Sequence, residues 1–211
     1  MNAIYNHIVD SMKRHKKLLA VLIDPDKITT QKVLSFIEKV NASMATHIFV
    51  GGSTVKGNVT SALVSKIKSC TNLPIVLFPG SISQITTSAD ALLFLSLISG
   101  RNPDYLIGKQ IEVVSKLREI DLEIISTGYV LIESGKKTAV QEVTKTSPMP
   151  RHDINAIVDT AVAGEFLGMR MIYLEAGSGA LNPINANIIS HVKKALKIPL
   201  IVGGGIKNKS Q

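Results

Sequence analysis

The feature that most constrains this chain is an alternation of short, continuous apolar runs with longer segments of helical period. Seven runs rich in Val, Ile and Leu occur along the 211 residues, at positions 18–23, 47–50, 74–78, 91–95, 123–132, 171–175 and 199–202. Runs of this kind are typical of parallel strands buried on both faces, and the segments between them are typical of connecting helices. The pattern predicts repeated βα units around a parallel sheet.

Small and polar residues follow nearly every run, at the expected carboxyl end of each strand. A TIM-type (β/α) barrel builds its site from several such loops, whereas a doubly wound sheet concentrates its site at one switch point. We therefore predict a single α/β domain of the barrel type over residues 1–211. Because a complete barrel has eight βα units in about 250 residues, we expect the eighth unit to be missing at the C-terminal end, through truncation or because the barrel stays open.

The composition fits a globular protein that handles anionic small molecules. The apolar fraction is 45% and the net charge is +8, and a positive charge attracts anions. The sequence shows no pattern of a nucleic-acid-binding module and no signal peptide. No run reaches the roughly 18 apolar residues that span a bilayer, and the one cysteine, Cys70, excludes a disulfide framework. We expect a cytoplasmic protein. Residues 13–17 form a basic cluster, which we interpret as a solvated helix end in preference to a site for transient docking on acidic lipid.

Two glycine-rich motifs predict phosphate-binding loops. Gly203, Gly204 and Gly205 follow the last run, and residues 176–179 (Ala-Gly-Ser-Gly) follow the sixth. Glycine lets backbone N–H groups approach a phosphate closely, and barrels often hold phosphate after their last two strands. A tight turn is the alternative for the triple glycine. Phosphate binding is favoured because consecutive glycines cost backbone entropy.

Glu175 ends the sixth apolar run, where an ionised carboxylate is costly unless it is paired or hydrogen-bonded. One interpretation is a structural salt bridge to a neighbouring strand. The other is a general base: the loop after Glu175 would hold the phosphate of a phosphorylated alcohol, and the carboxylate would take the proton of its hydroxyl group.

Two further motifs predict a metal site. Asp24 directly follows the first run, and carboxylate oxygens suit Mg²⁺, which proteins usually hold with one or two oxygens plus substrate phosphates. Ser53, which follows Gly51 and Gly52 after the second run, offers a hydroxyl to the metal or to a phosphate. For both motifs the alternative is an ordinary turn with a helix cap. We expect Asp24, Glu175 and the two glycine turns to meet at one cavity that holds two anionic substrates.

Five segments, in this order, resemble the geranylgeranylglyceryl phosphate synthases and their heptaprenyl relatives: residues 22–27, 49–53, 77–80, 173–179 and 202–206. The resemblance implies a TIM-type barrel and a Mg²⁺-dependent prenyltransferase that joins a prenyl diphosphate to glycerol 1-phosphate in lipid biosynthesis. Some bacterial relatives carry Lys two positions before the metal-binding Asp, where this chain has Leu22. The chain is therefore more similar to the archaeal-type branch, also found in bacteria, and geranylgeranyl diphosphate is the implied donor.

The resemblance also implies roles for particular residues. Asp24 and Ser53 would bind Mg²⁺ with the diphosphate, Glu175 would be the base, and Tyr129 would be a wall of the pocket. Glycerol 1-phosphate would be bound by Tyr173, Leu174, Glu175, Ala176, Gly177, Ser178, Gly179, Gly203, Gly204 and Gly205. Family members often form homo-oligomers. Two alternatives remain open from the residues alone, namely another phosphate-binding barrel enzyme and a non-catalytic barrel that binds a phospholigand.

Overall fold

The computed structural model describes residues 3–52 and 59–208. The strands are β1 (Ala20–Ile23), β2 (His47–Val50), β3 (Ile75–Leu77), β4 (Ala91–Ser96), β5 (Glu123–Leu131), β6 (Met171–Glu175) and β7 (Leu200–Gly203). The α-helices are α1 (Ala3–Lys13), α2 (Thr30–Asn41), α3 (Val59–Lys68), α4 (Lys109–Leu117), α5 (Ala139–Thr144), α6 (Ile154–Phe166) and α7 (Ala186–Ala195). A 3-10 turn, η1 (Ile82–Gln84), and a π-helical turn, η2 (Asp104–Gly108), complete the elements.

The strands follow one another in the sheet in chain order, from β1 to β7. The pairs β1–β2, β2–β3, β3–β4, β5–β6 and β6–β7 are parallel. A helix or helical turn lies in each connection, as a parallel sheet requires. This order is that of a (β/α) barrel, because a doubly wound sheet reverses its strand order at a switch point. The predicted fold class is confirmed, with seven strands among the described residues.

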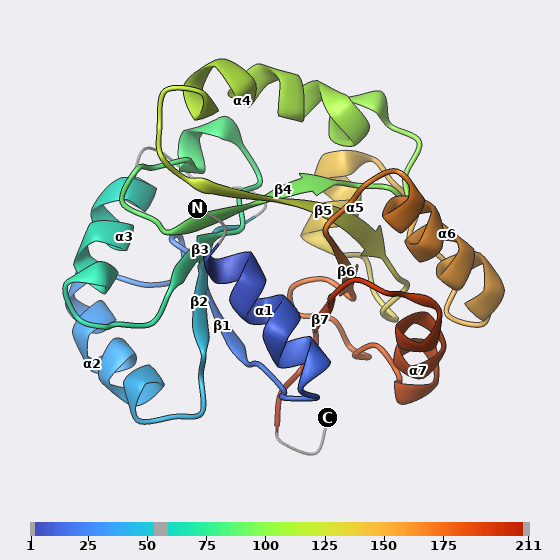
Figure 1. Cartoon of the computed structure of the whole chain (residues 1–211), viewed down its shortest axis with the longest axis horizontal. Helices are drawn as coiled ribbons and strands as arrows, with labels where there is room; N and C mark the ends of the chain where they lie inside the picture. Colours follow the sequence, from blue (N-terminus) through green and yellow to red (C-terminus); the bar gives the residue numbers. More distant parts are fainter. Residues whose placement is uncertain (1–2, 53–58, 209–211) are drawn as a thin grey trace. The chain divides into compact units, whose positions relative to one another are not determined.

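The chain forms two compact units, and β4 and β5 pass through both. Unit 1 contains residues 1–93 and 112–125, and unit 2 contains residues 94–111 and 126–211. In unit 1, α2 and α3 lie side by side next to β2 and β3 (Figure 1). In unit 2, α6 packs against α7 and against β6 (Figure 1), and the buried core there includes Ile157, Ile172, Leu174, Ile188 and Val192.

Helix α1 was not among the predicted elements, and its first turn is tied to the start of β5. The carboxylate of Glu123 accepts hydrogen bonds from the N–H groups of Ile4 and Tyr5 at 2.9 and 2.8 Å. A carboxylate at this position satisfies free N–H groups and complements the helix dipole. The basic residues 13–17 lie exposed at the other end of α1, as the solvated-helix-end interpretation expects.

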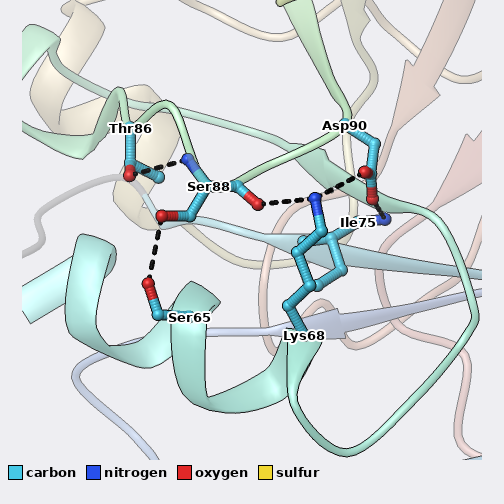
Figure 2. A network of polar contacts seen from close by, with 6 residues as sticks. All are labelled: Ser65, Lys68, Ile75, Thr86, Ser88 and Asp90. Atoms are coloured by element: carbon cyan, nitrogen blue, oxygen red, sulfur yellow. Dashed lines mark hydrogen bonds and ion pairs between the residues drawn. The ribbon is translucent and has the colours of Figure 1, made fainter.

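Asp90 belongs to a polar network that joins α3 to the first residue of β3 and to the segment just before β4 (Figure 2). Its carboxylate accepts hydrogen bonds from Lys68 Nζ and from the N–H of Ile75, each at 2.8 Å. Lys68 also donates to the carbonyl of Ser88 at 3.1 Å, and the hydroxyl of Ser65 donates to that of Ser88 at 3.0 Å. The network lies at the amino ends of the strands, so it stabilises the unit and stands apart from the loops predicted to carry chemistry.

The sequence also predicts a helix over residues 104–120, a helical stretch over 61–70 that includes Cys70, and an irregular polar excursion over 133–150, and these three local predictions need correction. The helix predicted over residues 104–120 begins with the π-helical turn η2 and ends at Leu117. Cys70 follows α3 and is not inside it. The polar excursion at residues 133–150 contains the short helix α5. The sequence did not predict this helix, because six residues are too few to show a helical period. Among the described residues, no helix is both long and apolar enough to cross a bilayer.

Candidate active site

Glu175 is the last residue of β6, and its side chain is 5% exposed. The carboxyl group accepts a hydrogen bond from the N–H of Gly177 at 2.5 Å and further hydrogen bonds from the hydroxyls of Tyr173 and Tyr129. A carboxylate offers about four acceptor positions, so these three donors leave capacity for one more hydrogen bond. Among the described residues, the partners of Glu175 are two phenols and a backbone amide and none is a basic side chain, so the interpretation as a salt bridge is wrong there.

The two tyrosines reach Glu175 because of strand geometry. Tyr173 and Glu175 are two residues apart on β6, and alternate residues of a strand point to the same face. Tyr129 is the register partner of Tyr173 on β5, and the two rings stack with their centroids 5.4 Å apart. All three side chains are less than a tenth exposed. The parallel pairing of β5 and β6 therefore builds a buried cluster of two phenols and one carboxyl group.

Burial sets the protonation of this cluster. It raises the pKa of Glu175, because the charged carboxylate loses water, while the hydrogen bonds from Gly177, Tyr173 and Tyr129 oppose that rise. Burial and the charge of Glu175 raise the pKa of both tyrosines well above 10, so they remain neutral donors. A carboxylate with a raised pKa is a stronger proton acceptor than an exposed one, which suits a general base.

The two glycine turns of unit 2 meet at the Glu175 carboxylate. A Cβ on Gly204 would overlap Glu175 Oε1 and lie 2.6 Å from the nitrogen of Gly177, and a Cβ on Gly203 would overlap the hydroxyl of Tyr173. Gly204 also has a φ of 86°, which disfavours other residues. The structure therefore brings Gly177, Gly203 and Gly204 together around Tyr173 and Glu175.

Several N–H groups in these turns are available to an anion. Those of Gly179, Gly204 and Gly205 have no hydrogen-bond partner in the parts of the chain that the structure describes. The side chains of Leu174 and Ala176 are fully buried, and the Ala176 N–H donates to the Gly203 carbonyl at 3.0 Å. The side chains of these two predicted binding residues therefore lie in the hydrophobic core and support the turn. Free backbone N–H groups clustered at glycine turns are a common cradle for phosphate.

In unit 1, Asp24 lies just after β1 with its side chain 22% exposed. One carboxylate oxygen forms an ion pair with Lys27 Nζ at 3.0 Å, and the other accepts from the N–H of Asp26 at 3.1 Å. A Cβ on Gly52 would lie 3.0 Å from Asp24 Oδ1, so glycine keeps the space beside the carboxylate open.

Gln84 is a structural residue that the sequence analysis missed. The side chain of Gln84 is buried on η1 and forms two hydrogen bonds with the backbone of Gly52. It accepts from the Gly52 N–H at 3.1 Å and donates to the Gly52 carbonyl at 2.8 Å. A Cβ on Gly51 would overlap the carbonyl oxygen of Phe78. The two glycines are thus required for close packing between the loops after β2 and β3. A lone Gln after an apolar run carries no sequence signal for this role.

The donor set around Asp24 fits Mg²⁺ held mainly by a substrate. Residues 3–52 and 59–208 contain no group of three or more His, Cys, Asp or Glu side chains that could hold a metal by themselves. One carboxylate beside an open glycine is what a metal shared with a diphosphate needs. Ser53, the other predicted ligand, lies outside the described residues. The expectation that Asp24 and Glu175 share one cavity stays a prediction.

Comparison with known proteins identifies the family. The model of the PcrB family matches residues 11–211. The chain belongs to the PcrB family. Its relatives in this family include the geranylgeranylglyceryl phosphate synthase of Zunongwangia profunda, 52% identical over 100% of this chain and 90% of that protein. The synthase of Flavobacterium johnsoniae is 50% identical over 98% of this chain and 85% of that protein.

A solved structure supports the same assignment. The (S)-3-O-geranylgeranylglyceryl phosphate synthase of Thermoplasma acidophilum, in complex with its substrate sn-glycerol-1-phosphate, is 32% identical to this PcrB-family chain. It superimposes with a TM-score of 0.90 over 96% of this chain and 81% of that protein. The family resemblance predicted from the five sequence segments is confirmed.

Proposed function

We propose that this chain is a prenyltransferase that joins geranylgeranyl diphosphate to sn-glycerol 1-phosphate and releases diphosphate. A hydroxyl oxygen of glycerol 1-phosphate forms a bond with C1 of the prenyl group, and the bond from C1 to the diphosphate oxygen breaks. The names of the similar proteins support this reaction. The single structural observation that carries it is the buried Glu175, hydrogen-bonded by two phenols and bordered by two glycine turns.

Glu175 takes the hydroxyl proton in this proposal. Its raised pKa gives it affinity for a proton, and its remaining acceptor position suits a substrate hydroxyl. Tyr129 and Tyr173 hold the carboxyl group in place as neutral donors. The position of the carboxyl group is therefore set before substrate binds, which reduces the reorganisation needed in the transition state.

The glycine turns hold the phosphate of the acceptor substrate. The free N–H groups of Gly179, Gly204 and Gly205 lie on the turns that border Glu175. A phosphate bound there places the glycerol hydroxyls one short carbon chain away, towards the carboxylate.

Asp24, together with Ser53, would hold Mg²⁺ in the proposal, and Mg²⁺ would neutralise the charge of the diphosphate leaving group. The ammonium group of Lys27 lies 3.0 Å from an oxygen of the Asp24 carboxylate, which shows that a positive charge can be held at this position. The fit rests on one half-buried carboxylate and the glycine next to it.

The test is a direct assay of the reaction. Labelled sn-glycerol 1-phosphate is mixed with geranylgeranyl diphosphate and the protein, with Mg²⁺ or with excess EDTA. We expect lipid-soluble label only with Mg²⁺. If glycerol 1-phosphate binds but no label becomes lipid-soluble under any condition, the chain is a phospholigand-binding barrel and the proposal is wrong.

A further inference from the structure

The loop that connects β5 to α5 lies against the glycine turn after β6. A Cβ on Gly179 would lie 3.3 Å from Lys136 Nζ, and a Cβ on Gly177 would overlap the side chain of Thr138. Both contacts come from the polar excursion that follows β5, a segment to which the sequence analysis assigned no site residue. The ammonium group of Lys136 therefore lies beside the turn that presents free N–H groups.

The backbone that carries Lys136 is anchored on both sides. Ser134 is 3% exposed, its hydroxyl donates to the carbonyl of Lys136 at 3.3 Å, and its own carbonyl accepts from the N–H of Asn182 at 3.0 Å. On the other side, Thr138 and Gln141 form a capping box at the start of α5. The side chain of Lys136 is exposed and extends from a backbone position that these hydrogen bonds hold in place.

Lys136 differs from two nearby described cations, Lys137 and Arg151, in how its charged end is used. Its neighbour Lys137 forms an ion pair with Glu142 at 3.4 Å. The guanidinium of Arg151 donates to the carbonyl of Pro183 at 2.7 Å and so connects loops. Within the described parts of the chain, the ammonium group of Lys136 has no ion pair or hydrogen bond.

A cation beside this turn would strengthen the binding of a phosphate group. The N–H of Gly177 is already used by Glu175, and an ionised Glu175 repels a second anion placed close to it. Backbone N–H groups supply partial charges only, whereas an ammonium group supplies a full charge and a charge-assisted hydrogen bond.

We infer that Lys136 binds the phosphate group of the acceptor substrate together with the turn at residues 177–179. The inference rests on the proposed function, because that function supplies a phosphate monoester as the ligand. Lys136 acts in substrate binding, so its loss should raise the KM for glycerol 1-phosphate more than it lowers kcat. An arginine keeps the charge and should retain most of the affinity.

The experiment compares Lys136→Met with Lys137→Met, a matched change at the neighbouring lysine. Binding of sn-glycerol 1-phosphate and of inorganic phosphate is measured by calorimetry, at low and high salt. We expect Lys136→Met to weaken both ligands about 10-fold or more, as for loss of a charged hydrogen bond. Lys137→Met should change them less than about 2-fold. Affinity should fall less with added salt in Lys136→Met than in the unmodified protein.

Two outcomes separate this inference from the proposed function. If Lys136→Met binds glycerol 1-phosphate as tightly as the unmodified protein, Lys136 has no part in the site, whatever the turnover. If the unmodified protein shows no prenyl transfer but Lys136→Met still loses affinity for both phosphate ligands, the proposed function fails and the phosphate contact is supported.

Discussion

Tyr173 and Glu175 leave the same face of β6, and the phenol donates a hydrogen bond to the carboxyl group. Both side chains are nearly inaccessible to water, at 6% and 5% exposed. The tyrosine favours the charged form of the carboxyl group, whereas burial favours the neutral form. The proton affinity of Glu175 therefore depends on its neighbours.

We expect Glu175→Gln to lower kcat by about 100-fold or more, because general base catalysis typically contributes that much. The amide keeps an acceptor for the Gly177 N–H, so affinity for glycerol 1-phosphate should change only a few-fold. Steady-state kinetics and calorimetry measure the two effects. A fully active variant would remove Glu175 from the mechanism.

The stability of this variant provides the folding control. The folded-state pKa of Glu175 is raised above its ordinary value, so the unmodified protein loses stability as pH rises through the interval between the two pKa values. Glutamine does not titrate, so the stability of the Gln variant lacks this pH dependence. We expect it to be at least as stable at pH 8, with an advantage that disappears below about pH 4.

Tyr129→Phe and Tyr173→Phe should each move the acid limb of the kcat profile to higher pH. Each change removes a hydrogen bond that lowers the pKa of Glu175, so the carboxyl group becomes protonated at a higher pH. Tyr5→Phe on α1, in the other compact unit, is the control and should leave the profile unmoved. An unchanged acid limb in both active-site variants would show that Glu175 does not control the rate.

Gly204→Ala should abolish activity, and Gly168→Ala should not. The two glycines have φ values of 86° and 87°, so both substitutions carry the same backbone strain, about 1–2 kcal/mol. A Cβ at Gly204 overlaps Glu175 Oε1, whereas one at Gly168 meets nothing within 4 Å. Thermal unfolding and kcat, measured for both, separate strain from the steric effect. Equal activities would contradict the close approach of Gly204 to the carboxylate.

Asp24→Asn should raise the Mg²⁺ concentration for half-maximal activity roughly 10-fold or more, because the amide is a weaker ligand without charge. Asp26→Asn is the matched control, since Asp26 is exposed and follows the same strand. Titration of Mg²⁺ into each EDTA-treated protein, followed by the assay, measures the shift. The metal assignment fails if the two variants have the same Mg²⁺ requirement.

His47 should make the fold sensitive to mild acid. Burial, and to a lesser extent the charge of His7, lowers the pKa of His47 from 6.5 to about 4. The unfolded chain takes up a proton near pH 6.5 and the folded chain does not, so stability falls as pH drops from about 6.5 to about 4, by up to about 3 kcal/mol.

Chemical denaturation between pH 4 and 8 measures this effect. His47→Gln should flatten the pH dependence, because glutamine does not titrate. The exposed His191 on α7 provides the control, and His191→Gln should keep the slope of the unmodified protein. Equal slopes for all three proteins would show that other groups cause the acid sensitivity.

The sequence by itself was sufficient for the fold class, the seven strands and the residues that end them. These depend on local patterns: a buried parallel strand must be apolar at every position, and a strand end beside an anion must be small or polar. The sequence also predicts a helix cap at Asp153 for the same reason, and its carboxylate accepts a hydrogen bond from the backbone N–H three residues later.

Only the tertiary structure decided which groups surround Glu175. Tyr129 is 46 residues away in sequence and reaches the carboxyl group through the register of β5 with β6. Gly204 and Lys136 come to the same turns from loops whose packing no local pattern encodes. Helix α1 and the amide of Gln84 were missed for the same reason. Local propensity identifies elements, whereas register and loop packing arise from contacts between residues far apart in the chain, and those contacts set the proton affinity and the charge of the site.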